Sequence, residues 1–193
     1  MPDLYIIAGC NGAGKTTASY TILPEILNCK EFINADEIAK GISPFQPETV
    51  SILAGRIMLD RINELLNQQV DFAIETTLTT LSYRKTIEFA KAKGYRITLL
   101  YFWLNDVDLA IERVKIRVSE GGHHIPEDVI IRRYYKGIDN LINVFKNLCD
   151  DWIIADNSVK PYTIIATGES SKTIEVRNHE KWKKLIDLAN GKR

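Results

Sequence analysis

A glycine-rich stretch near the start of the chain constrains the fold more than any other feature. The segment GCNGAGKTT (9–17) follows an apolar run, LYIIAG (4–9), and precedes a segment with helical periodicity. It fits the pattern GxxxxGK(S/T), whose fixed positions are occupied by Gly9, Gly14, Lys15 and Thr16. In a strand–loop–helix of this kind, backbone N–H groups surround a phosphate and the helix dipole adds to the attraction. The pattern therefore predicts a nucleoside triphosphate site.

The residue types in this loop predict how the phosphates and a metal ion are held. Lys15 is expected to reach the β- and γ-phosphates, and the Thr16 hydroxyl is expected to ligate Mg²⁺. ATP or GTP, together with Mg²⁺, are thus the expected cofactors. The remaining phosphate contacts are expected from the rest of the loop, namely Gly9, Asn11, Gly12, Ala13, Gly14 and Thr17.

Short apolar runs alternate with helical segments along the chain. Strands are predicted at 4–9, 31–35, 71–76, 96–104, 151–156 and 162–167. Helices are predicted at 47–68 and 126–148, which both begin with proline, and at about 178–190, after a polar turn TGESSKT (167–173). Continuously apolar strands between helices are typical of a parallel sheet covered on both faces. We therefore expect a doubly wound α/β fold and, from 193 residues, a single domain over 1–193.

Composition excludes several classes of protein. The chain has 25 Lys and Arg against 25 Asp and Glu, so no overall charge favours nucleic acid or a membrane surface. The cysteines are three, widely spaced and without a CxxC pair, which indicates reduced thiols rather than a disulfide framework. No apolar run approaches the roughly 18 residues of a membrane span. We expect a cytoplasmic protein with no membrane association.

Acidic residues at predicted strand ends distinguish a kinase from a GTPase. No NKxD motif for guanine recognition occurs in the chain. Instead, NADEI places Asp36 after the second predicted strand, and IETTL places Glu75 and Thr77 at the end of the third. Ligands of open α/β sheets lie outside the carboxyl ends of the strands. Asp36 is thus a candidate general base, and Glu75 and Thr77 are candidates for holding the acceptor; Glu75 could alternatively hold Mg²⁺ through water. A helix N-cap or a first-turn charge is the competing interpretation for both acids.

A set of motifs in fixed order resembles the zeta-toxin family of P-loop kinases. The motifs are GCNGAGKTT, INADEIA, IETTL, GYRITLLYFWL, RVKIRVSEGGHHIP with IIRRY, and DNS, within about residues 4–168. The resemblance implies a nucleotide-kinase-like P-loop NTPase fold: three layers, a mainly parallel five-stranded sheet and a helical lid. It implies phosphorylation of UDP-N-acetylglucosamine by Mg-ATP or Mg-GTP, and an antitoxin protein that blocks the nucleotide site. This chain is shorter than the characterised toxins, so part of its acceptor-binding surface is expected to be missing or different.

The resemblance also implies residue roles. Lys15 and Thr16 match the phosphate-loop pair, Asp36 the catalytic base, and Glu75 and Thr77 the acceptor-binding strand end. The family's two phosphate-clamping arginines correspond to Arg113 or Arg117 and to Arg132 or Arg133. We take Arg117 and Arg133 as catalytic, together with Lys15 and Asp36, and assign Arg113 and Arg132 to substrate binding. These lie in a lid expected at about 113–136, with Gly121 and Gly122 as a flexible turn.

The remaining features of the lid leave some alternatives open. His123 and His124 are adjacent and lack convergent partners, so we expect them to line the turn near the acceptor rather than to bind a metal. The lid's basic residues do not favour polynucleotide binding, although a nucleic-acid 5′-hydroxyl kinase uses the same core. The leading hypothesis is therefore a small-molecule kinase acting on a hydroxyl. The alternatives are a nucleic-acid end kinase and a non-catalytic NTP-binding regulatory module.

Overall fold

A computed structural model describes residues 1–122 and 124–191. Within these residues, no helix is both long enough and apolar enough to cross a membrane. The elements follow one another as β1 (Asp3–Ala8), α1 (Lys15–Thr21), a π-helix (Ile22–Ile26), β2 (Glu31–Ile33), α2 (Ala35–Ile42), a 3-10 helix (Pro47–Val50), α3 (Ser51–Gln68), β3 (Phe72–Thr76), α4 (Tyr83–Ala92), β4 (Arg96–Trp103), α5 (Val107–Ser119), α6 (Glu127–Asn140), a second π-helix (Leu141–Phe145), α7 (Lys146–Leu148), β5 (Asp151–Asp156), β6 (Thr163–Glu169), β7 (Lys172–Val176) and α8 (His179–Ala189).

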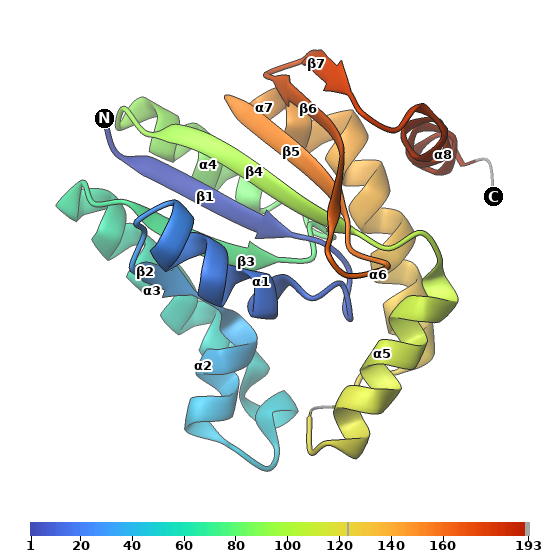
Figure 1. The fold of residues 1–193 in the computed structure, drawn as a ribbon. Helices are drawn as coiled ribbons and strands as arrows, with labels where there is room; N and C mark the ends of the chain where they lie inside the picture. The colour runs from blue at the N-terminus through green and yellow to red at the C-terminus, as the bar shows by residue number, and fades with distance from the viewer. Residues whose placement is uncertain (123, 192–193) are drawn as a thin grey trace.

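The strands of the described residues form one sheet in the order β2-β3-β1-β4-β5-β6-β7 (Figure 1). The first five strands in this order are parallel, whereas β6 is antiparallel to β5 and β7 is antiparallel to β6. The predicted α/β fold with a mainly parallel sheet is thus confirmed. The sheet is wider than the five strands that the resemblance implied, because β6 and β7 extend it.

The segment predicted as a polar turn, 167–173, instead contains the end of β6 and the start of β7. The prediction was wrong because β7 is exposed along nearly all its length, so its sequence, KTIEV, lacks the apolar run of the buried strands. β7 is an edge strand that pairs with β6 alone, and polar residues are common on such an edge.

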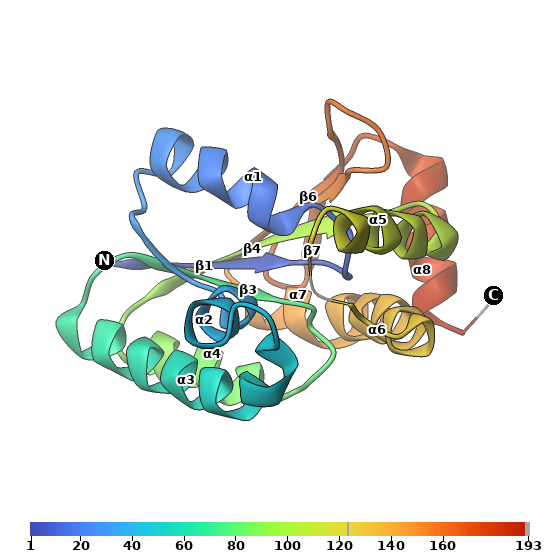
Figure 2. The ribbon, with the colours of Figure 1, turned by 90° about the horizontal axis from the view of Figure 1, so that it is seen from below.

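Helices cover both faces of the sheet. Figure 2 shows α1 on one face and α3 and α4 on the opposite face. The central strand β1 is buried from Leu4 to Ala8, which explains its unbroken apolar sequence. At the other side of the molecule α8 packs on α6 and β6, and Trp182 stacks on the fully buried Trp152 with ring centroids 5.9 Å apart.

The strand register brings the functional segments to one edge of the sheet. Ala8 at the end of β1 pairs with Thr76 of β3, and Ile33 at the end of β2 pairs with Ile74 of β3. The chain after Ala8 is the glycine-rich loop, and the chain after Ile33 begins α2. The carboxyl ends of β1, β2 and β3 therefore carry the loop and both predicted acids to the same place.

Candidate phosphate-transfer site

The loop between β1 and α1 has the geometry of a phosphate-binding loop. Gly14 is the N-cap of α1 with φ of 78°, in the left-handed region that glycine adopts without steric cost. The carbonyl of Cys10 accepts two hydrogen bonds, from the Ala13 N–H at 3.2 Å and from Lys15 Nζ at 3.0 Å. Lys15 is therefore folded over the loop, with only 7% of its surface exposed. The residues predicted to hold phosphates form this continuous turn, and Thr17 lies exposed on the first turn of α1.

The carboxylate of Glu75 joins this loop to the neighbouring strand ends. Thr16 Oγ1 donates to Glu75 Oε2 at 2.8 Å, and Lys15 Nζ lies 3.6 Å from Glu75 Oε1. Asn34 Nδ2, from the end of β2, donates to Glu75 Oε2 at 2.9 Å. The structure thus brings together three residues predicted to be functional and adds Asn34, which the sequence analysis missed.

Asn34 also fixes the start of α2, which carries Asp36. Its Oδ1 atom accepts hydrogen bonds from the backbone N–H groups of Asp36 at 2.8 Å and Glu37 at 3.4 Å, and Asn34 is therefore the N-cap. The alternative that Asp36 caps the helix is wrong, because Asn34 has that role; Asp36 lies in the first turn with its side chain exposed. Asparagine directly before an acidic helix start is the sequence signal that could have identified this cap.

Thr77 follows β3 at the same edge of the sheet. It is half-buried, and its Oγ1 lies 3.0 Å from Thr79 Oγ1. The N–H of Leu78, between them, donates to Thr76 Oγ1 at 3.1 Å. The hydroxyls of Thr77 and Thr79 thus lie on the bend that directly follows Thr76.

Burial raises the pKa of the Glu75 carboxyl above its ordinary value of 4.5, and the negative charge of Asp36 raises it further. The charge of Lys15 and the hydrogen bond from Thr16 act in the opposite direction without cancelling the effect of burial. Keeping Glu75 ionised therefore lowers the stability of the ligand-free protein, which is common for carboxylates at functional sites.

Replacing Glu75 by glutamine is expected to raise the melting temperature of the ligand-free protein at neutral pH. As the pH rises, the Glu75 carboxyl loses its proton near pH 4.5 in the unfolded chain and at a higher pH in the folded protein. Stability is therefore lost between the two pKa values, and the loss persists above both. Glutamine keeps the shape without the charge. An increase of about 2–4 °C for each 1 kcal/mol relieved is expected for a chain of this size.

Thermal unfolding followed by circular dichroism across the acidic to neutral range tests this expectation. The difference between the variant and the wild type should close as the pH falls below 4.5. A variant that melts below the wild type at neutral pH would mean that the loss of the Lys15 ion pair outweighs the relief of burial.

Arg113 anchors the helix α5 to the backbone around the loop. Its guanidinium donates to the carbonyls of Asn157 at 2.9 Å and Ser158 at 2.8 Å, with a longer contact of 3.5 Å to the carbonyl of Gly12. Asn157, just after β5, donates from Nδ2 to the carbonyl of Ala13 at 2.8 Å. Asn157 belongs to the DNS motif of the resemblance, but no role was predicted for it, because its contact depends on a residue 144 positions away.

The other three candidate clamp arginines differ in what they contact. Arg133 of α6 donates to Asn11 Oδ1 in the phosphate-binding loop at 3.1 Å. Arg132 lines a groove between α6 and α8. Arg117 is exposed near the end of α5, where its carbonyl accepts a hydrogen bond from the Gly122 N–H at 2.8 Å. The structure thus brings Arg113 and Arg133 to the loop, and places Arg117 one helical turn farther along α5 than Arg113.

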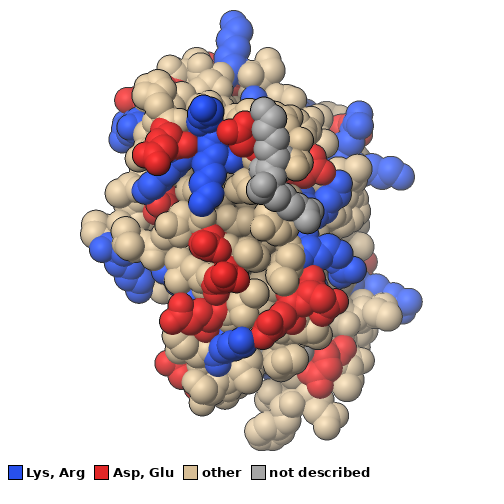
Figure 3. Space-filling model, turned by 90° about the vertical axis from the view of Figure 1, so that its right-hand side faces the viewer, with Lys and Arg blue, Asp and Glu red and all other residues tan. Residues whose placement is uncertain are grey.

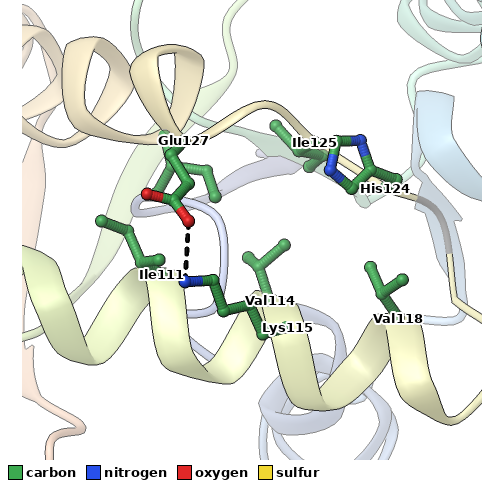
Figure 4. Close-up of a pocket in the computed structure, with 8 residues that line it drawn as sticks. Ile111, Val114, Lys115, Val118, His124, Ile125 and Glu127 are labelled. Carbon is green, nitrogen blue, oxygen red and sulfur yellow. Dashed lines mark ion pairs between the residues drawn. The ribbon is translucent and has the colours of Figure 1, made fainter.

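Between α5 and α6 lies a cavity of about 140 Å³. Figure 4 shows its largely apolar lining from the two helices, with His124 at one end and the ion pair of Lys115 and Glu127, 2.7 Å long, at the other. His123, which we expected beside His124, lies outside the described residues. Among the described residues no group of three or more His, Cys, Asp or Glu side chains is arranged to hold a metal ion.

The surface around α5, α6 and α8 carries charges of both signs. Figure 3 shows lysine and arginine side chains beside aspartate and glutamate side chains on this face. A surface that binds nucleic acid usually presents one broad basic patch. The visible face therefore lacks the electrostatic feature that a nucleic-acid substrate would favour.

Comparison of the sequence with known proteins identifies the family. The sequence matches the zeta toxin family over residues 1–164. An uncharacterized protein of Haemophilus influenzae is 33% identical over 126 residues, which cover 65% of this chain and 88% of that protein.

Comparison of the structure gives the same fold. The crystal structure of AvrRxo1-ORF1:-ORF2 with ATP contains a chain with a TM-score of 0.73 and 16% identity, covering 97% of this chain and 64% of that one. The chain therefore spans less than two thirds of the length of this relative. The PezAT chromosomal toxin–antitoxin system of Streptococcus pneumoniae contains a chain with a TM-score of 0.66 and 16% identity, covering 100% of this chain and 86% of that one. The family match over most of the chain confirms the predicted resemblance, and the chain belongs to the zeta toxin family.

Proposed function

We propose that this chain transfers the γ-phosphoryl group of ATP or GTP, with Mg²⁺, to a hydroxyl of a small molecule. One observation carries the proposal: the Glu75 carboxylate accepts hydrogen bonds from Thr16 of the phosphate-binding loop and from Asn34, which caps α2, the helix that carries Asp36 in its first turn. A donor-phosphate site and a candidate base are thus joined through one buried carboxylate. Kinases need that combination, because their catalysis rests on positioning and electrostatics.

The loop side of the site would hold the donor. Lys15 would exchange its contact with the Cys10 carbonyl for the β- and γ-phosphates. The Thr16 hydroxyl and the Glu75 carboxylate, 2.8 Å apart, are oxygen donors of the kind Mg²⁺ prefers, so the residues fit this ion, with Glu75 acting directly or through water. The bound ion would neutralise charge on the phosphate oxygens.

The other side would hold and activate the acceptor. Asp36 takes the proton of the acceptor hydroxyl while the oxygen of that hydroxyl attacks the γ-phosphorus. The bond from the γ-phosphorus to the β–γ bridging oxygen breaks, which releases ADP or GDP. Thr77, and Glu75 where it is free of the metal, would hold the acceptor. Arg133, and Arg117 after closure of a lid at about 113–136, would clamp the transferred group and exclude water. Arg113 and Arg132 are the less favoured clamp positions.

UDP-N-acetylglucosamine is the first candidate acceptor. Family membership supports it, since the resemblance of the motifs implies this substrate. The relative solved with ATP supports ATP as donor, and the toxin–antitoxin system of Streptococcus pneumoniae supports an antitoxin protein as a partner of this chain.

Incubation of the purified chain with Mg²⁺, γ-labelled ATP or GTP, and UDP-N-acetylglucosamine tests the proposal. We expect a phosphorylated sugar nucleotide and the nucleoside diphosphate in equal amounts, and mass spectrometry measures both products. A chain that binds ATP but phosphorylates neither this acceptor nor any component of a metabolite extract would contradict the kinase proposal.

The same assay separates the alternatives. Labelling of a 5′-hydroxyl oligonucleotide, with binding that falls steeply as salt rises, would point to a nucleic-acid end kinase. A phosphorylated product formed from a different metabolite would support the kinase proposal and identify a different acceptor.

A further inference from the structure

One face of α6 touches both halves of the site. Arg133, Gly137 and Asn140 are spaced by four and three residues, so they lie in a row along one face of the helix. Arg133 contacts the phosphate-binding loop, whereas Gly137 and Asn140 lie against the segment 77–79 that follows β3. We propose that Gly137 and Asn140 are positioning residues that set this segment, here called the acceptor loop, at a fixed distance from the phosphate-binding loop. This inference rests on the proposed function for its kinetic consequences.

Asn140 holds the acceptor loop through a buried hydrogen bond. Its Nδ2 donates to the carbonyl of Leu78 at 2.6 Å, and Asn140 is 2% exposed. Leu78 is fully buried and has φ of 55°, a left-handed conformation that is unusual for leucine. Such a conformation persists where its surroundings hold it in place. The hydrogen bond from Asn140 is one such restraint, and the bond from the Leu78 N–H to Thr76 Oγ1 is the other.

Gly137 sets how closely the helix approaches the loop. A Cβ atom at this position would lie 2.8 Å from the carbonyl oxygen of Thr77 and 3.2 Å from the hydroxyl oxygen of Tyr101. Any side chain here must push the Thr77 backbone away from α6. Since the Thr77 hydroxyl is a proposed acceptor ligand, the absence of a side chain at Gly137 determines where that ligand stands.

The same helix is held firmly against the rest of the site. Tyr134 is 2% exposed and donates from its hydroxyl to the carbonyl of Leu104 at 2.7 Å. Arg133 reaches Asn11 one turn before Gly137. With a rise of about 1.5 Å per residue, α6 separates the contact at 133 from the contact at 140 by about 10 Å. The helix therefore acts as a rigid spacer between donor and acceptor.

The substitution Gly137→Ala tests the spacer, with Gly55→Ala as its matched control. Both glycines lie inside helices, where alanine is the better helix former. A Cβ at Gly55 would meet nothing within 4 Å, whereas a Cβ at Gly137 meets the Thr77 carbonyl. We expect Gly137→Ala to lower kcat/KM for the acceptor by about 10–100-fold, since a displacement of 1 Å can cost 10²-fold, and to leave ATP binding unchanged. Gly55→Ala should leave both unchanged.

Hydrogen–deuterium exchange of the ligand-free protein gives a readout that does not depend on activity. The Leu78 amide, bonded to Thr76 Oγ1, should exchange faster in Gly137→Ala, while the phosphate-binding loop exchanges as in the wild type. Gly55→Ala should not alter the exchange of the Leu78 amide. Asn140→Ala, which removes the donor to the Leu78 carbonyl, should act on the acceptor loop as Gly137→Ala does.

The outcomes separate this inference from the proposed function. A wild type that phosphorylates nothing would contradict the proposed function, and faster exchange at Leu78 in Gly137→Ala would still support the spacer. The inference would be overturned if Gly137→Ala matched Gly55→Ala both in acceptor kinetics and in the exchange of the Leu78 amide. If Asn140→Ala fails to fold, Gly137→Ala still decides the outcome.

Discussion

Replacement of Asp36 by asparagine is expected to lower kcat by about 10²–10⁴-fold, the usual contribution of a general base. Asparagine keeps the shape of the side chain but cannot accept the proton of the acceptor hydroxyl. The fold should be unaffected, because Asp36 is exposed and Asn34 caps α2 in its place. Binding of Mg-ATP should change little, since the loop contacts of Lys15 and Thr16 remain.

The neighbouring residue offers a matched control for this prediction. Glu37 is also exposed, also lies in the first turn of α2, and also donates its backbone N–H to Asn34 Oδ1. Glu37→Gln removes one negative charge from the same helix end, so it reproduces any effect on the helix dipole. Steady-state kinetics should show a large loss of kcat for Asp36→Asn and a small one for Glu37→Gln.

Two results would contradict the role of Asp36. Equal losses in the two variants would mean that Asp36 acts through the helix rather than on the acceptor. A cellular effect that survives Asp36→Asn but disappears in Lys15→Ala would instead indicate a non-catalytic module that only binds nucleotide.

The fold could be predicted from the sequence wherever burial dictates composition. The parallel strands are largely apolar because both their faces are covered, and Pro47 and Pro126 mark the starts of the helical segments that follow them. β7 could not be predicted in this way, because an exposed edge strand is selected for pairing with its neighbour and not for burial. Its residues resemble those of a turn.

The site could be predicted where a motif specifies chemistry, and less where contacts join distant segments. The loop pattern predicted Lys15 and Thr16, strand ends predicted Glu75, and the structure places the three side chains in contact. The contacts of Asn34 with Glu75 and of Asn157 with Ala13 were missed because they join residues 41 and 144 positions apart, which no local spacing reveals. The contact of Gly137 with the acceptor loop has the same origin, since it depends on how α6 packs against the chain after β3.

The adjacent arginines of α6 provide the second large expected effect. Consecutive residues of a helix point in different directions, and here Arg133 reaches Asn11 of the phosphate-binding loop while Arg132 lines the groove beside α8. An arginine that stabilises the charge of a transferring phosphoryl group contributes about 10³–10⁵-fold to turnover. Arg133→Ala is therefore expected to lower kcat by about that factor, and Arg132→Ala by far less.

Stability and a conservative variant distinguish a clamp from a structural contact. Arg133 is half-buried and donates to the uncharged Asn11, so Arg133→Ala should lower the melting temperature only slightly. Arg133→Lys keeps the charge but loses the planar fork that pairs with phosphate oxygens, and should recover only part of kcat. Kinetics and thermal unfolding of the three variants measure both quantities. If Arg132→Ala lowered turnover more than Arg133→Ala, the clamp would be Arg132, and α6 would have to rotate on closure to bring that side chain to the phosphate.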